Sequence, residues 1–177
     1  GSNVNDQDYV QWSDTVKSYL TVCDNGNYMR VQSGAIKGKL LVEYYSSDFE
    51  PLSTKLIDNE LPIFGAFYDS GNNYYVLSGQ ENPKQNDSLE VFRITKYDKN
   101  WNKIKSCGLY GANTTVPFDA GSARMTHSGD HLLVRTCHEM YKSSDGNNHQ
   151  SNVTIEVDMP SMTITDSYTG IMNVDYG

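Results

Sequence analysis

The chain has 177 residues, and 37% of them are hydrophobic. This length and apolar content suffice for one compact domain, and the chain is short for two domains of usual size. Its formal net charge of −8 argues against binding to a nucleic-acid backbone or docking on an anionic membrane, because both need clustered basic side chains. No apolar run reaches the roughly 20 residues that a membrane-spanning helix requires, so no membrane insertion is expected.

A first structural unit is expected over residues 14–58. The segment 1–13 precedes it, and its opening Gly-Ser resembles the scar of a removed tag. In the unit, VCDNG at 22–26 predicts a tight turn that leads into an apolar strand, because Asp and Gly supply turn dihedral angles. The string VEYYSSDFEPL at 42–52 predicts two more strands around a turn. A helix near residues 14–20 is the alternative, but alignment with the later units favours a strand.

Two further units, expected over 59–115 and 116–168, carry the same two markers in the same order. The first marker recurs as FYDSG and MTHSG, and the second recurs as ITKYDKNWNKI and TIEVDMPSMTI. In this alignment Phe49 and Trp101 share the eighth place of the second marker, where the third unit has Ser161. Each unit is predicted to hold about four short strands, and 169–177 to begin a further unit.

Repeats of four strands and roughly 40 to 50 residues are typical of β-propeller blades. The second marker resembles the blade-ending hairpin of bacterial secreted and cell-surface β-propellers. The resemblance implies an all-β, β-propeller-like array of about three four-stranded antiparallel blades in a secreted or cell-surface protein, and it carries over no catalytic residues. The alternative is a three-repeat sandwich that folds back on itself.

Three blades are too few to close a propeller, since rings use roughly four to eight. An open array would leave bare edges at both ends, and long exposed edges promote aggregation. The chain is therefore expected to be part of a larger ring. A second polypeptide fragment, a second copy in a homo-oligomer, or further sequence would complete it.

The three cysteines, Cys23, Cys107 and Cys137, form neither a disulfide framework nor a metal-binding spacing. We expect each to be a small buried hydrophobic residue, and the sequence leaves open whether one disulfide forms.

All the histidines lie in the third unit, at His127, His131, His138 and His149. In a hairpin centred on residues 145–146, His149 would oppose Lys142 and His138 would oppose Val153. Those positions are too far apart along the strands to share an ion. No metal and no other cofactor is expected.

A ligand site is expected where polar side chains gather in the third unit, because Asp, Asn, Gln, His and Tyr suit a polyhydroxylated ligand. Arginines near the predicted axis could bind a carboxylate or sulfate bidentately. The candidate ligand-binding residues are Arg124, Arg135, His138, Glu139, Tyr141, Asp145, His149 and Gln150. The alternatives are a solvated hairpin loop and an ion pair between Arg135 and Glu139, which share a strand face.

These features favour a non-catalytic binding or scaffold domain that recognises a glycan or a protein partner. The alternative is a fragment of a propeller enzyme of the glycosidase, lyase or sulfotransferase type. There His138, Glu139 or His149 would supply acid–base chemistry and Arg124 would contact an anion. A purely architectural repeat is a third option. A deep pocket with a perturbed titrating group would favour the enzyme.

Overall fold

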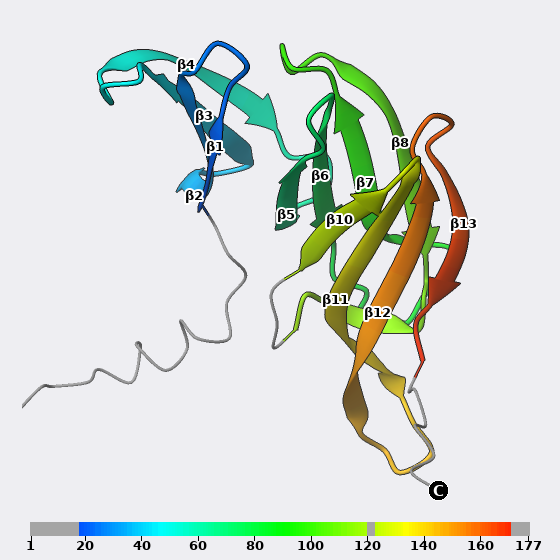
Figure 1. Ribbon diagram of the computed structural model, residues 1–177. Helices are drawn as coiled ribbons and strands as arrows, with labels where there is room; N and C mark the ends of the chain where they lie inside the picture. Colours follow the sequence, from blue (N-terminus) through cyan, green and yellow to red (C-terminus); the bar gives the residue numbers. More distant parts are fainter. Residues whose placement is uncertain (1–17, 120–122, 171–177) are drawn as a thin grey trace, which may run out of the picture.

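The computed structural model describes residues 18–119 and 123–170, and all regular structure in these ranges is β (Figure 1). Thirteen strands form three separate antiparallel sheets that lie beside one another without closing into a ring. The predicted all-β, propeller-like array is confirmed. The expected N-terminal segment 1–13 and residues 171–177 of the expected further unit lie outside the described residues.

Among the described residues there is no helix long and apolar enough to cross a membrane.

Each sheet is built on a meander of four strands, each of which pairs with the next one along the chain. The first sheet, called blade 1, comprises β1 (Ser18–Val22), β2 (Tyr28–Ile36), β3 (Lys39–Tyr45) and β4 (Pro51–Asp58). The second, blade 2, comprises β5 (Ile63–Asp69), β6 (Tyr74–Gly79), β7 (Glu90–Tyr97) and β8 (Lys103–Tyr110). The third, blade 3, comprises β10 (Arg124–Ser128), β11 (His131–Lys142), β12 (Asn148–Asp158) and β13 (Thr163–Tyr168).

A short extra strand, β9 (Thr114–Pro117), follows blade 2 in the chain but belongs to blade 3. It pairs with the far end of β11, where Val116 lies opposite Glu139. The position expected to divide the second unit from the third therefore falls inside β9. This strand makes blade 3 a five-stranded sheet and joins the end of the chain's second unit to its third.

Two hydrophobic layers hold the blades together, one on each face of blade 2. Blade 1 contributes aliphatic side chains to the first layer, and blade 2 contributes mainly aromatic ones: Met29, Val31, Leu40 and Val42 meet Phe64, Phe67, Tyr74, Val76, Tyr97 and Trp101. The second layer joins Tyr75, Leu77, Phe92 and Ile94 of blade 2 to Leu132, Val134, Ile155 and Val157 of blade 3. Strand alternation assigns Tyr74 and Val76 of β6 to the first layer and Tyr75 and Leu77 to the second, so blade 2 is apolar on both faces.

The hairpin of the second marker has the same backbone in blades 1 and 2. The amide of Phe49 donates to the carbonyl of Ser46, and that of Trp101 donates to the carbonyl of Asp98, at 2.9 and 3.0 Å. Phe49 and Trp101 both have positive φ, 62° and 65°. In blade 3 the corresponding residue is Met162 (φ 51°) rather than Ser161, because the turn there contains one more residue after its Asp. The alignment of the third unit is corrected accordingly.

The long hairpin of blade 3 also differs from the expected register. A β-bulge between Glu139 and Lys142 shifts the pairing, so that Lys142 lies opposite Asn148 and His138 lies opposite Ser151. The predicted pairings of Lys142 with His149 and of His138 with Val153 are therefore wrong.

Candidate functional site

The first strands of the three sheets converge on one pocket of about 430 Å³. It is lined by Tyr19, Leu20, Thr21, Phe67, Tyr68, Asp69, Ala123, Arg124 and Met125, which come from β1, from β5 and from β10 and the residue before it. In a propeller, the strands that begin each blade face the central axis. Arg124, at the start of β10, lines this pocket.

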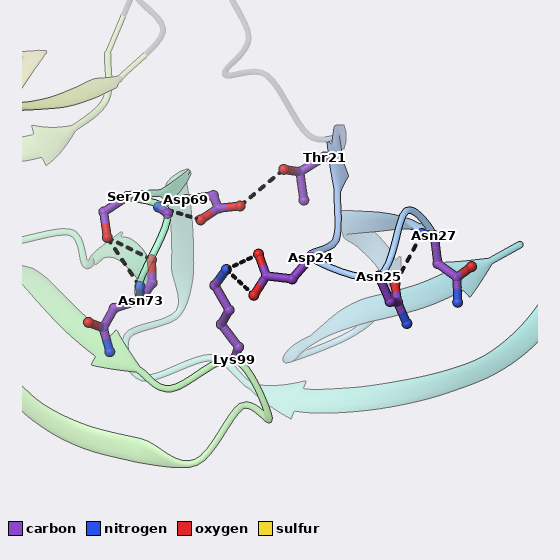
Figure 2. A network of polar contacts seen from close by, with 9 residues as sticks. Thr21, Asp24, Asn25, Asn27, Asp69, Ser70, Asn73 and Lys99 are labelled. Carbon is purple, nitrogen blue, oxygen red and sulfur yellow. Dashed lines mark hydrogen bonds and ion pairs between the residues drawn. The ribbon is translucent and has the colours of Figure 1, made fainter. Parts of the chain in front are cut away.

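Hydrogen bonds across the sheets tie these first strands together. Thr21 Oγ1 donates to Asp69 Oδ2 at 3.1 Å, which joins blade 1 to blade 2 (Figure 2). Tyr68 Oη and His127 Nδ1 lie 2.5 Å apart, with their rings edge to face, and join blade 2 to blade 3. The sequence alignment put Tyr68 and His127 at equivalent places in two units, but it gave no sign that equivalent places in neighbouring blades bond to one another.

The turns of blades 1 and 2 meet in a polar network beside these strands (Figure 2). Lys99 Nζ donates to both carboxylate oxygens of Asp24, at 2.8 and 2.9 Å, and this pair raises the pKa of Lys99. Lys55 Nζ donates to the carbonyl of Asn100 at 3.1 Å. An open pocket of about 460 Å³ adjoins this network. These bonds join residues of blade 1 to residues in a turn of blade 2, so they help to fix how blade 1 sits on blade 2.

The face of blade 3 that lies away from blade 2, called here its outer face, carries four of the eight predicted ligand-binding residues. Cross-strand pairing places Arg124, Arg135, Thr154 and Tyr168 in one row over the four strands β10 to β13. By strand alternation, Glu139 lies on the same face four residues along β11 from Arg135, and it is paired with Gln150 of β12. The structure thus brings together Arg124, Arg135, Glu139 and Gln150 on one surface.

Arg124 and Arg135 are exposed and directly opposite each other on neighbouring strands. Within the described residues neither has an ion-pair partner, and the expected alternative, a pair between Arg135 and Glu139, does not form there. The chain's other two arginines are both paired. Arg30 contacts Glu43, and Arg93 contacts Glu60 and Glu90. Like charges directly opposite on a sheet destabilise it, so this arrangement is unusual.

A pocket of about 260 Å³ lies beside the two arginines and is lined by Arg124, Arg135, Thr136, Cys137, Asn152 and Val153. Because Arg124 also lines the axial pocket, one side chain borders both cavities. Cys137 Sγ lies 3.5 Å from Asn152 Oδ1 within this smaller pocket. The arrangement offers guanidinium, amide and thiol groups to a small polar ligand.

Three of the predicted residues, Glu139, Gln150 and Tyr141, make hydrogen bonds to other parts of the chain. Thr115 Oγ1 of β9 donates to Glu139 Oε1 at 2.9 Å. Gln150 Nε2 donates to Asp119 Oδ2 at 2.7 Å. Tyr141 Oη accepts a hydrogen bond from Asn82 of the β6–β7 loop, and burial is the first cause that raises the pKa of Tyr141.

His138 lies on the opposite face of β11 and is fully buried, at 0% exposure. Its Nδ1 lies 2.6 Å from Thr114 Oγ1. Burial disfavours the charged imidazolium and lowers the pKa of His138 to about 4, while the nearby backbone of Thr169 opposes this shift only in part. The outer face of blade 3 and the ring of His138 are separated by the sheet itself.

Asp145 and His149 lie at the exposed tip of the long hairpin and pair with each other, with Asp145 Oδ2 and His149 Nε2 2.6 Å apart. Ser143 and the amide of Asn147 also donate to Asp145, and these bonds hold the pKa of that carboxyl well below its usual range. The groups named for acid–base chemistry are thus divided: His138 lies inside, Glu139 lies on the outer face, and His149 lies at the hairpin tip.

The remaining histidine and the cysteines make no metal site in the described part of the chain. There, no three His, Cys, Asp or Glu side chains are placed to hold an ion. His131 Nδ1 lies 3.3 Å from Glu156 Oε1. Cys23, Cys107 and Cys137 are free thiols, each partly buried, and burial raises the pKa of Cys107 to about 11.

Comparisons with known proteins show a likeness of fold. No family model and no curated protein sequence matches the chain. Among solved structures, the chain is similar to a crystal structure of an ACO/RPE65 chimera, a β-propeller, with a TM-score of 0.56 and 11% sequence identity. The likeness covers 88% of this chain, which spans only 38% of the length of that one. At this identity the likeness concerns the fold alone.

Proposed function

We propose that this chain is a non-catalytic binding module of a secreted or cell-surface protein, and that the outer face of blade 3 recognises a glycan bearing carboxylate or sulfate groups. The observation that carries the proposal is the pair of opposed arginines, Arg124 and Arg135, without carboxylate partners in the described chain. An anion placed between two guanidinium groups removes their repulsion and accepts bidentate hydrogen bonds from them.

Other residues on the same face offer the hydrogen-bonding groups and the aromatic ring that commonly bind a sugar. Thr154 and Asn152 offer hydrogen bonds beside Arg135, and hydroxyl and amide groups pair well with sugar hydroxyls. Tyr168 stands at the end of the row, 41% exposed, where an aromatic ring can stack on a sugar face. It lies two strand spacings from Arg135, about 10 Å, so one ligand can reach both side chains.

A simpler account of the polar face is that blade 3 ends the array, since terminal repeats carry polar outer faces that keep them soluble. That account explains Thr126, an exposed residue on this face, and Glu156, which pairs with His131. It does not explain why the two unpaired arginines are the two that face each other, in a chain with net charge −8. The chain has 22 Asp and Glu residues, and none of those that the structure describes forms an ion pair with Arg124 or Arg135.

The proposal is tested by titrating the protein with oligogalacturonate and with its methyl ester, in which the carboxylates are neutral, and with a sulfated oligosaccharide. Calorimetry should detect binding of an acidic probe and little of the ester. Arg135→Gln and Arg124→Gln should each weaken binding by about tenfold or more, because charge-assisted hydrogen bonds contribute about 1.5 to 3 kcal/mol. Added salt should weaken binding as well.

Arg30→Gln is the matched control, because it removes the same charge from blade 1, where Arg30 is already paired with Glu43. Its affinity for the acidic probe should remain near that of the unmodified protein. If all three variants weaken binding equally, the attraction is one of overall charge and the site is wrong. Equal binding of the ester, or failure of every acidic probe to bind, also contradicts the proposal.

A further inference from the structure

Blade 1 has one face packed on blade 2 and one face that the described residues leave exposed, called here the outer face of blade 1. By strand pairing, this outer face carries Val22, Tyr28 and Tyr45 in one row, with Leu20 beside them on β1 and Leu56 on β4. Leu20, Val22 and Leu56 are 60%, 61% and 53% exposed. These side chains form an apolar area at one end of the face. The next row of the same face carries Arg30 and Glu43, an ion pair, at the places that the buried Val76 and Thr95 occupy in blade 2.

The same aromatic cluster occurs twice in the molecule. On the outer face of blade 1, Tyr28 pairs with Tyr45 across β2 and β3, and Phe49 stacks on Tyr28 with ring centroids 4.5 Å apart. In blade 2 the equivalent strands pair Tyr74 with Tyr97, and Trp101 contacts both rings, at 5.0 and 5.3 Å.

Phe49 and Trp101 also occupy the same turn, with the same hydrogen bonds and φ near 60°. The two clusters are copies of one structural element. The difference between them is the neighbour. Trp101 is 6% exposed because blade 1 covers it with the aliphatic side chains of Met29, Val31, Leu40 and Val42. Phe49 is 58% exposed in the described structure.

The backbone gives a second reason to expect a cover. A bulky residue with positive φ is strained, and such strain persists where surrounding contacts compensate for it. Burial of the indole ring compensates at Trp101. At Phe49 the turn keeps the same strained conformation, while its side chain gains only one stacking contact.

We propose that the outer face of blade 1 docks a further four-stranded β-blade, whose facing side carries aliphatic residues in the manner of Met29, Val31 and Val42. The interface would repeat the one between blades 1 and 2. The outer face of blade 3 in a second copy does not fit this role, because its row of Arg124, Arg135 and Thr154 is polar. This inference does not depend on the glycan proposed above.

Blade 1 itself is the probe for this test, because it carries the required aliphatic face. In an extended chain, residues 18–62 are duplicated ahead of Ser18, and the linker 59–62 joins the added blade as it already joins blades 1 and 2. The added copy can then pack its Met29, Val31 and Val42 against the outer face of the original blade 1. Urea unfolding of this chain is compared with that of the unmodified protein.

Phe49→Ala is placed in turn in the original copy, in the added copy and in the unmodified chain. In the original copy, where Phe49 becomes covered, it should lower the folding equilibrium constant by roughly a hundredfold. In the other two settings Phe49 stays bare, and the change should cost less than about tenfold. Equal losses in all three settings overturn the proposal. So do unprotected amides in β2 of the added copy under hydrogen exchange, which would mean that the added blade does not dock.

The remaining occupant to test is a second copy of the chain, and sedimentation of the unmodified protein measures it. A dimer that Phe49→Ser disperses would assign this face to self-association and overturn docking of a blade. A monomer, or a dimer that survives Phe49→Ser, leaves the face open for a further blade and supports the proposal together with the urea result.

Discussion

The outer face of blade 1 carries Phe49, Tyr28 and Val22, whereas the outer face of blade 3 carries Arg124, Arg135 and Asn152. Both faces are uncovered, and both belong to antiparallel sheets of the same design. The first carries, around Phe49, the aromatic cluster that is buried between blades 1 and 2, and beside it the Arg30–Glu43 ion pair, whereas the second carries mainly polar and charged residues. The two ends of one array are therefore built for different neighbours.

The comparison shows how to interpret a bare face in an open repeat array. Exposure alone does not distinguish a terminal surface from a missing interface. Comparison with the equivalent face inside the array does, because the covered copy shows which residues a neighbour requires. By this standard, blade 1 repeats the aromatic cluster that blade 2 offers to its neighbour, and blade 3 does not repeat the apolar faces that blades 1 and 2 offer to the next blade.

The strongest test of the difference between the covered and the exposed aromatic cluster is to truncate Trp101 and Phe49 separately in the unmodified chain. Trp101→Ala should destabilise the protein by about 3 to 5 kcal/mol, because it opens a cavity between blades 1 and 2. Phe49→Ala should cost only about 1 kcal/mol, because it loses little more than stacking on Tyr28. Urea unfolding measures both. Similar costs would mean that the two positions do not differ in their neighbours.

Much of the fold follows from local sequence. Turn residues such as Asp24 and Gly26, followed by β-branched and aromatic runs, predict the hairpins correctly, and their recurrence predicts the number of sheets. The predicted alignment and register are wrong at two places, where a turn or a strand contains an extra residue. Met162, rather than Ser161, occupies the place of Trp101, and a bulge after Glu139 shifts the hairpin register. Short turns and bulges of this kind leave no periodic signal in the sequence.

The candidate site was less predictable. Period-two alternation places Arg135 and Glu139 on one face and His138 on the other, so that much follows from sequence. The opposition of Arg124 and Arg135 depends on the pairing of β10 with β11, and the bond between Tyr68 and His127 depends on the contact between two blades. The site residues stay predictions, since placing them on one surface does not identify a ligand.

A pH experiment sharpens the contrast between the two faces of blade 3. His138, on the buried face, has a pKa lowered to about 4 in the folded protein, against about 6.5 unfolded. Between these values the unfolded chain binds the proton and the folded protein does not, so stability is full above pH 6.5 and falls as the pH drops toward 4. We expect a loss on the order of 2 kcal/mol across this window, measured by urea unfolding at several pH values.

His138→Gln should flatten this pH dependence, whatever it does to stability at pH 7. Thr126→Ala is the control, since Thr126 is an exposed residue on the outer face of blade 3 that does not titrate, and it should leave the slope between pH 6.5 and 4.5 unchanged. The lowered pKa values of Asp145 and Asp158 act below this window, because carboxylates stabilised by hydrogen bonds lose their contribution only at lower pH. A slope that survives His138→Gln would assign it to other groups.

The smallest expected effect concerns the polar network that fixes blade 1 on blade 2. A double-mutant cycle with Asp24→Ala and Lys99→Ala should give a coupling energy of about 0.2 to 1 kcal/mol, as for other exposed ion pairs, and added salt should reduce it. A matched cycle with Lys39→Ala and Asp58→Ala tests a pair inside blade 1. If the Asp24–Lys99 coupling vanishes on truncation of Trp101 while the Lys39–Asp58 coupling persists, the aromatic layer is what positions blade 1. Loss of both couplings would instead mean that blade 1 itself unfolds, and the outer face of blade 1 could then not be treated as a preformed surface.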